Sequence, residues 1–129
     1  MANLDELKQK YAGTIATIQG FSDVGAAIDQ ISLDGEKLLL KAHVPSKVVA
    51  NRVWDTIKEA DPTFSDLHHE IATSGADEQP YTVQSGDNLS RIAKRFYGTP
   101  NKYTGIAKAN GIANPDLIRV GQQLRLPVM

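Results

Sequence analysis

Apolar residues near the start of the chain recur at steps of three and four. The positions are Leu4, Leu7, Tyr11, Ile15 and Ile18. This spacing places them on one face and predicts an amphipathic helix, with Asn3 and Glu6 in the arrangement of a capping box. We expect the helix to stop near Gly20. Its apolar face then requires a sheet to pack against.

The next segment alternates between apolar and polar residues on both sides of Asp34-Gly35. The apolar positions are Ile31 and Leu33 before this pair and Leu38, Leu40, Ala42 and Val44 after it. Asp-Gly between two alternating runs is a strong signal for a two-stranded hairpin. We therefore predict a β-hairpin over this segment.

A second helix and a last strand follow the hairpin. Ser46 is placed to cap the helix, which must end before Pro62 because the residue preceding a proline disfavours the helical conformation. The apolar face of this helix carries Val49, Val53 and Ile57. The strand is predicted from the alternation of Leu67, His69 and Ile71. Trp54 lies off the apolar stripe, and we favour a place at the edge of the core over a contact between domains.

A different pattern occupies the C-terminal part of the chain. A strand at Tyr81–Val83 and a turn at Ser85-Gly86 lead to Asp87, the expected N-cap of a helix that ends at Gly98. The inward residues of this helix are Leu89, Ile92, Ala93 and Phe96. A second helix, about residues 101–110, adds Tyr103, Ile106 and Ala107, and the last strand adds Leu124 and Leu126. The predicted order is βααβ.

Charge is distributed unevenly along the 129 residues. Residues 1–74 hold 7 basic and 11 acidic residues, a net of −4, whereas residues 80–129 hold 7 basic and 2 acidic residues, a net of +5. Because the break falls on a polar run, we predict two domains, residues 1–73 and 81–129, joined by a linker over residues 74–80. The chain has no Cys, which excludes a disulfide framework, a thiolate metal site and a cysteine nucleophile.

Two stretches of the C-terminal part resemble the two ends of a LysM module: YTVQSGDNLSRIAKRFYG at residues 81–98 and NPDLIRVGQQLRLP at residues 114–127. The resemblance implies a glycan ligand that contains N-acetylglucosamine, of the peptidoglycan or chitin type, in a shallow groove between two loops. The glycan-binding residues that it implies are Gly86, Asp87, Asn88, Leu89, Ile112, Asn114, Pro115, Asp116, Leu117 and Ile118. For Asp87 we favour the structural role of a helix cap, alone or together with shaping of the loop, over contact with the glycan. Of the adjacent Leu117 and Ile118, one is expected to pack inward and the other to be exposed.

The order of elements over residues 1–73, with IDQISLDGEKLLLKAHVPS at its centre, resembles a BON domain, a small bacterial module of αββαβ topology. This resemblance implies interaction or ligand binding rather than catalysis. The expected fold class is α+β: an N-terminal αββαβ domain with its helices on one face of a small sheet, linked to a C-terminal βααβ domain.

We expect a non-catalytic binding protein, because the sequence has no nucleophile elbow, zinc-protease motif, Gly-rich phosphate loop or calcium loop. Its first expected partner is the glycan. The domain order also resembles small bacterial potassium-binding proteins, which makes K+ the alternative ligand and the one cofactor under consideration. Its ligands stay open, because K+ sites are built from oxygens, often backbone carbonyls, that any sequence has. A LysM adaptor in a phage-tail or secretion assembly is a second alternative.

Other partners are not expected. His68 and His69 are adjacent on a predicted strand and point to opposite faces, so they cannot chelate one metal, and no metal site is assigned to them with His43. A net charge of −1 argues against nucleic acid, and no stretch approaches the ~18 apolar residues of a membrane span. The start of the chain lacks a signal-peptide pattern, so we expect a cytoplasmic protein. We also expect a monomer.

Overall fold

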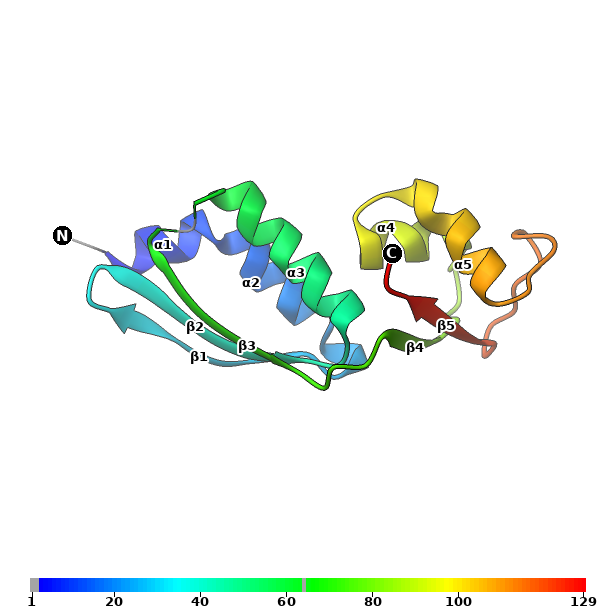
Figure 1. The fold of residues 1–129 in the computed structure, drawn as a ribbon, viewed down its shortest axis with the longest axis horizontal. Coiled ribbons are helices and arrows are strands. Elements are labelled where there is room, and N and C mark those ends of the chain that lie inside the picture. Colours follow the sequence, from blue (N-terminus) through cyan, green and yellow to red (C-terminus); the bar gives the residue numbers. More distant parts are fainter. Residues whose placement is uncertain (1–2, 64) are drawn as a thin grey trace.

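A computed structural model describes residues 3–63 and 65–129 (Figure 1). Within these ranges the chain forms one three-stranded and one two-stranded sheet, each covered by helices on one side. We call residues 3–63 and 65–73 the N-terminal part and residues 78–129 the C-terminal part. The molecule is therefore of the α+β class, as predicted from the sequence.

The N-terminal part has its strands in the order β1-β2-β3, with β1 antiparallel and β3 parallel to the central β2. The strands are β1 (Ala27–Asp34), β2 (Lys37–Val44) and β3 (Leu67–Thr73). The helices are α1 (Leu4–Lys10), α2 (Ala12–Gly20), the short η1 (Ser22–Val24) and α3 (Lys47–Ala60). Figure 1 shows α1, α2 and α3 above the same face of the sheet. Elements follow one another as helix, hairpin, helix and strand.

The predicted hairpin and second helix are confirmed. Asp34 pairs with Lys37, so Gly35 and Glu36 form the turn, and Gly35 takes the positive φ of 61° that glycine tolerates best. In α3, the Ser46 hydroxyl caps the helix by accepting a hydrogen bond from the amide of Val49. The face of α3 carrying Val49, Val53 and Ile57 is fully buried.

The first helix is interrupted, where the sequence predicted a continuous one. Tyr11, with φ −100° and ψ 21°, separates α1 from α2. Its ring is fully buried and its hydroxyl bonds to Asp66, so the break coincides with a contact to a residue far along the chain. Beyond it Thr14 is buried and Ile15 only half-buried, so one predicted inward position is replaced by its neighbour, whereas Ile18 is fully buried as predicted.

The C-terminal part pairs β4 (Glu78–Thr82) with β5 (Gln123–Pro127) in antiparallel fashion. The helices between them are α4 (Leu89–Tyr97), the short η2 (Pro100–Lys102) and α5 (Tyr103–Ala109). The order is βααβ, as predicted. β4 begins at Glu78, inside the segment expected as a linker, because Gln79 is buried with its amide against Ser46.

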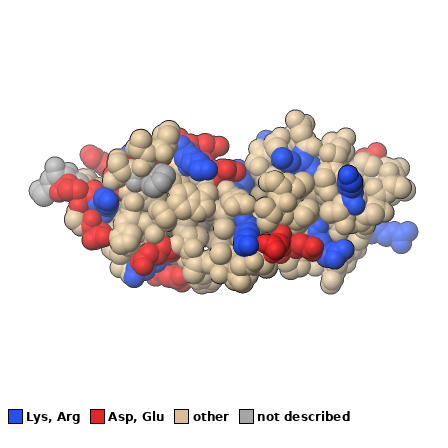
Figure 2. Space-filling model, viewed as in Figure 1, with Lys and Arg blue, Asp and Glu red and all other residues tan. Residues whose placement is uncertain are grey.

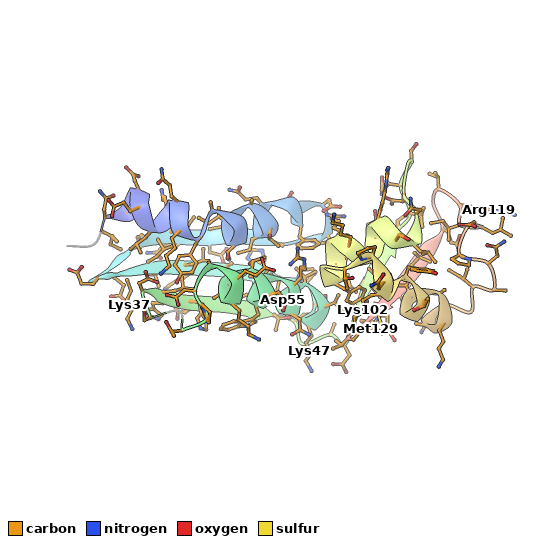
Figure 3. The ribbon with its side chains drawn as sticks, turned by 90° about the horizontal axis from the view of Figure 1, so that it is seen from above. Lys37, Lys47, Asp55, Lys102, Arg119 and Met129 are labelled. Carbon is orange, nitrogen blue, oxygen red and sulfur yellow. The ribbon has the colours of Figure 1, made fainter. Side chains whose placement is uncertain are left out.

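The two parts are in direct contact. The Ser46 hydroxyl donates to Oε1 of Gln79 over 2.6 Å, and Arg95 of α4 donates to the carbonyl of Gly20, at the end of α2, over 2.7 Å. The rings of Phe21 and Phe96 meet across the junction with centroids 5.0 Å apart. Figure 3 shows α3, which carries Asp55, meeting the C-terminal part, with Lys102 close to the junction and Arg119 at the far end.

Charged side chains follow the division seen in the sequence. In Figure 2, most Asp and Glu lie over the half that carries the N-terminus, with one further acidic group just beyond the middle, while Lys and Arg occur on both halves. Most ion pairs given by the structure lie within one part, such as Lys41 with Glu70, whereas Arg95 pairs with Asp23 across the junction.

Candidate functional site

A groove of about 450 Å³ lies where the start of α4, the start of α5 and the loop before β5 come together. Its lining residues are Asn88, Leu89, Ser90, Tyr103, Pro115 and Asp116. The two loops expected from the sequence therefore face each other across a real depression. Leu89 is almost fully buried, so it forms part of the supporting core, whereas Asn88, Ser90 and Asp116 are exposed.

The cap of α4 is Asn88, not Asp87 as predicted from the sequence. Asn88 Oδ1 accepts a hydrogen bond from the amide of Arg91 at 2.8 Å. Asp87 instead accepts from the Tyr81 hydroxyl at 2.5 Å and from the amide of Gln84 at 2.7 Å. These two donors turn the carboxylate back toward β4, which leaves the neighbouring Asn88 to cap the helix.

The same contact alters the acidity of Tyr81. Burial of the ring, followed by the hydrogen bond to Asp87 and the negative charge of that carboxylate, raises the pKa of Tyr81 to about 12. The phenol is therefore neutral at physiological pH and serves as a hydrogen-bond donor. Asp87 holds the first loop in place through Tyr81 and Gln84 rather than pointing into the groove.

The second loop is built on a turn at Asn114. Its side chain accepts a hydrogen bond from the amide of Asp116 at 3.0 Å, and its carbonyl accepts from the amide of Leu117 at 3.0 Å. This geometry separates the next two side chains, because Leu117 is 72% exposed whereas Ile118 packs partly buried against the core. Of the adjacent pair, Ile118 is the inward residue.

The structure brings together four of the ten predicted glycan-binding residues on the wall of the groove. These are Asn88, Leu89, Pro115 and Asp116. The six that do not line it are Gly86, Asp87, Ile112, Asn114, Leu117 and Ile118. Ile112 packs partly buried against the core, and the Gly86 carbonyl accepts a hydrogen bond from Arg91. Their expected contact with a glycan stays a prediction.

Sequence reasoning missed two residues of the wall, Ser90 and Tyr103. Ser90 lies at the start of α4 between the core residues Leu89 and Ile92, so no pattern in the sequence assigned it to a site. Tyr103 opens α5 and was assigned to the core, but it is only half-buried. No signal in the sequence distinguishes Tyr103 from a core residue, because its half-burial and its place opposite the start of α4 follow from how the helices pack.

The histidines are placed apart. His43 Nδ1 lies 3.0 Å from Asp29, and His68 Nδ1 lies 2.6 Å from Asp34. His69 lies on the other face of β3, with its ring 4.4 Å from that of Trp54, which packs at the edge of the core as predicted. Within residues 3–63 and 65–129, no group of three or more His, Asp or Glu side chains is placed to hold a metal ion. No helix in these ranges is long and apolar enough to cross a membrane.

Residues 81–127, which contain the groove, match the LysM domain family. An uncharacterized protein of Deinococcus radiodurans is 55% identical over 47 residues, which cover 36% of this chain and 19% of that protein. An esterase of Mycobacterium tuberculosis is 53% identical over 47 residues, which cover 36% of this chain and 10% of the esterase.

The potassium binding protein Kbp of Escherichia coli is 48% identical over 58 residues, which cover 43% of this chain and 39% of that protein. The matched segment thus spans less than two fifths of each of these three relatives. The strand order, the groove between the two loops and the family match agree for the same stretch of sequence: residues 81–127 are a LysM domain.

Proposed function

We propose that this protein binds a glycan that contains N-acetylglucosamine, and that the glycan lies in the groove between the two loops of the LysM domain. The observation that carries the proposal is the groove of about 450 Å³ at the place where those loops meet. A LysM domain implies glycan binding of the peptidoglycan type.

The chemistry of the wall suits an acetamido sugar. The half-buried ring of Tyr103 and the ring of Pro115 present apolar surface to a pyranose face or an acetyl methyl group. The carboxylate of Asp116 accepts hydrogen bonds from sugar hydroxyls, and the Ser90 hydroxyl both donates and accepts. Asn88 lines the groove and uses its carbonyl oxygen as the helix cap, so its amide nitrogen is the group that can donate to a sugar.

The test is a titration of the full chain with an N-acetylglucosamine pentamer, followed by residue-resolved NMR. We expect saturable shifts at Asn88, Ser90 and Asp116. Ser90→Trp places a large ring in the groove and should weaken binding at least tenfold. Ser85→Trp is the matched control, because Ser85 is exposed and does not line the groove. Equal affinity of wild type and Ser90→Trp would contradict the assignment.

A second candidate function is potassium binding, favoured by the 48% identity to the potassium binding protein Kbp. Its test is thermal unfolding in KCl and NaCl at equal ionic strength. A rise in melting temperature that KCl produces and NaCl does not supports this candidate. Equal melting temperatures in the two salts remove it and leave the glycan proposal unaffected.

A further inference from the structure

A second pocket, of about 220 Å³, lies at the junction of the two parts of the molecule. Its lining residues are Thr17, Gly20, Phe21, Arg52 and Arg95. Two of the five are arginines, one from α3 and one from α4, and none of the described residues that line it is acidic. A concave site with two guanidinium groups and no carboxylate has the donor set of an anion site.

The side chain of Arg52 is fixed by contacts that leave its two Nη groups available as hydrogen-bond donors. Its Nε donates to the carbonyl oxygen of Arg95 over 3.3 Å. Its guanidinium also lies against Gly98, where a Cβ atom would sit 3.5 Å from the Arg52 Cζ. In the part of the chain that the structure describes, the two Nη atoms have neither a hydrogen-bond acceptor nor an ion-pair partner, although Asp55 lies one turn further along α3. The side chain is thus positioned while its terminal donors remain available.

Arg95 is fixed more firmly. Its Nη2 donates to the carbonyl of Gly20 over 2.7 Å and to Asp23 over 2.5 Å. The rings of Phe21 and Phe96 lie 4.9 and 5.0 Å from its Cζ and form an apolar support. Asp23 does not line this pocket but lines an adjoining cavity of about 800 Å³ that shares Gly20 and Arg95 with it. Because Asp23 and the Gly20 carbonyl both accept from Nη2, Arg95 can offer a bound anion only its Nε and Nη1, and Arg52 carries the larger share of uncompensated charge.

We propose that this pocket binds a phosphate group, either inorganic phosphate or the phosphate of a small monoester. The positive charge of a guanidinium group complements the negative charge of a phosphate, and its planar N–H groups can form bidentate hydrogen bonds with two phosphate oxygens. Thr17 already donates its hydroxyl to the carbonyl of Gly13 over 2.7 Å, so the two arginines are the principal donors. At about 220 Å³, the pocket is smaller than the ~300–1,000 Å³ typical of sites for larger ligands, which limits the organic body of an ester.

Phosphate binding in this pocket would affect the contact between the two parts of the molecule. A phosphate bridging Arg52 and Arg95 would tie α3 of the N-terminal part to α4 of the LysM domain. The pocket and the glycan groove share no lining residue, so a negative result for one proposal does not contradict the other.

The experiment is an NMR titration of the full chain at constant ionic strength, with inorganic phosphate in one series and glycerol 3-phosphate in the other. We expect saturable shifts of the Thr17, Gly20 and Phe21 amides. Tighter binding of glycerol 3-phosphate would identify a monoester as the ligand, whereas equal or tighter binding of inorganic phosphate would identify the free anion. Absence of saturable shifts at these amides in both series would overturn the proposal.

Variants distinguish specific binding in this pocket from non-specific electrostatic attraction of the anion to positive charge. Arg52→Gln should weaken binding at least tenfold, and Arg52→Lys, which keeps the charge and loses the planar fork, should fall between Arg52→Gln and wild type. Lys94→Gln is the matched control, because Lys94 is exposed on α4 and does not line the pocket. It should change affinity less than twofold. Equal losses in Arg52→Gln and Lys94→Gln would also overturn the proposal, provided that both spectra remain those of the folded protein.

Discussion

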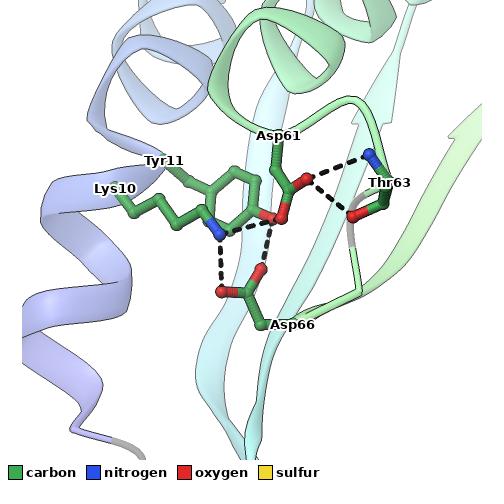
Figure 4. Close-up of polar contacts among 5 residues, drawn as sticks. All are labelled: Lys10, Tyr11, Asp61, Thr63 and Asp66. Atoms are coloured by element: carbon green, nitrogen blue, oxygen red, sulfur yellow. Dashed lines mark hydrogen bonds and ion pairs between the residues drawn. The ribbon is translucent and has the colours of Figure 1, made fainter.

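The hydroxyl of Tyr11 donates a hydrogen bond to Oδ1 of Asp66 over 2.6 Å, and Lys10 Nζ lies 2.7 Å from the other oxygen of that carboxylate (Figure 4). Lys10 also pairs with Asp61 at 2.9 Å, and Asp61 in turn accepts hydrogen bonds from Thr63. Lys10 and Tyr11 end α1, while the two aspartates lie between α3 and β3. The cluster therefore ties the break in the first helix to a connection about 50 residues away.

This cluster predicts a loss of stability in acid. Burial alone would raise the pKa of Asp66, but hydrogen bonds from Lys10 and Tyr11 outweigh it and hold that pKa below its ordinary value. The Lys10 hydrogen bond is also the main reason that the pKa of Asp61 is lowered. Carboxylates with a depressed folded-state pKa stabilise the fold above their unfolded pKa of about 4, and this contribution is lost as the pH falls through the folded value. The melting temperature should therefore decrease below about pH 4.

Circular dichroism melts of wild type, Asp66→Asn and Asp55→Asn over this acidic range check the assignment. Asp66→Asn should show the shallower dependence of melting temperature on pH, because it has one fewer depressed carboxylate to protonate. Asp55 is exposed on α3 and has no ion pair with any residue in 3–63 or 65–129, so Asp55→Asn should follow wild type. Parallel curves for wild type and Asp66→Asn would contradict the role of the cluster.

Asp87 is predicted to stabilise the LysM domain through Tyr81. Asp87→Ala leaves the Tyr81 hydroxyl and the Gln84 amide without their acceptor, so we expect a loss of about 1–3 kcal/mol in the free energy of unfolding. In Asp87→Asn an acceptor remains but the charge is removed, so the pKa of Tyr81 should fall below about 12. Chemical denaturation measures the first effect, and ultraviolet titration of tyrosinate against a Tyr81→Phe reference measures the second. An unchanged Tyr81 pKa in Asp87→Asn would contradict the contact.

Ser46 and Gln79 are predicted to couple the two parts of the chain energetically. Their hydrogen bond is buried, and Gln79 is 2% exposed. Removing either partner therefore leaves the other polar group with neither this hydrogen bond nor access to water. A double-mutant cycle of Ser46→Ala and Gln79→Met should give a coupling energy of about 0.5–3 kcal/mol. Ser46→Ala also removes the cap of α3, and the cycle cancels that separate cost. Lys47 and Asp77, an exposed ion pair at 3.0 Å, form the comparison cycle, for which about 0–1 kcal/mol is expected. A Ser46–Gln79 coupling near zero would show that this bond does not join the parts.

Local patterns in the sequence predicted those elements whose signals are local. The hairpin needed only Asp34-Gly35 between alternating runs, and α3 needed only a capping serine, an apolar stripe and a proline beyond its end. The break at Tyr11 could not be predicted in this way, because the apolar spacing continues through it. It coincides with the hydrogen bond of Tyr11 to Asp66, a contact that only the tertiary structure brings about.

The same distinction applies to the candidate site. Asp87 and Asn88 are both good capping residues, and only the donors on Tyr81 and Gln84 decide between them. The family resemblance located both loops, but it did not identify Tyr103, whose position on α5 looked like a core position. Which residues share a groove depends on how α4 and α5 pack, and periodicity along one helix carries no such information.

Leu117 and Ile118 are predicted to respond differently to the same substitution. Leu117 is 72% exposed, so Leu117→Asp should change the free energy of unfolding by less than about 0.5 kcal/mol. Ile118 packs against the core, so Ile118→Asp places a carboxylate among apolar groups and should destabilise the domain markedly. Chemical denaturation measures both. Because Leu117→Asp leaves the fold intact, its retention on insoluble peptidoglycan tests whether the exposed loop adds to glycan contact: weaker retention than wild type is expected, and unchanged retention would confine binding to the residues that line the groove.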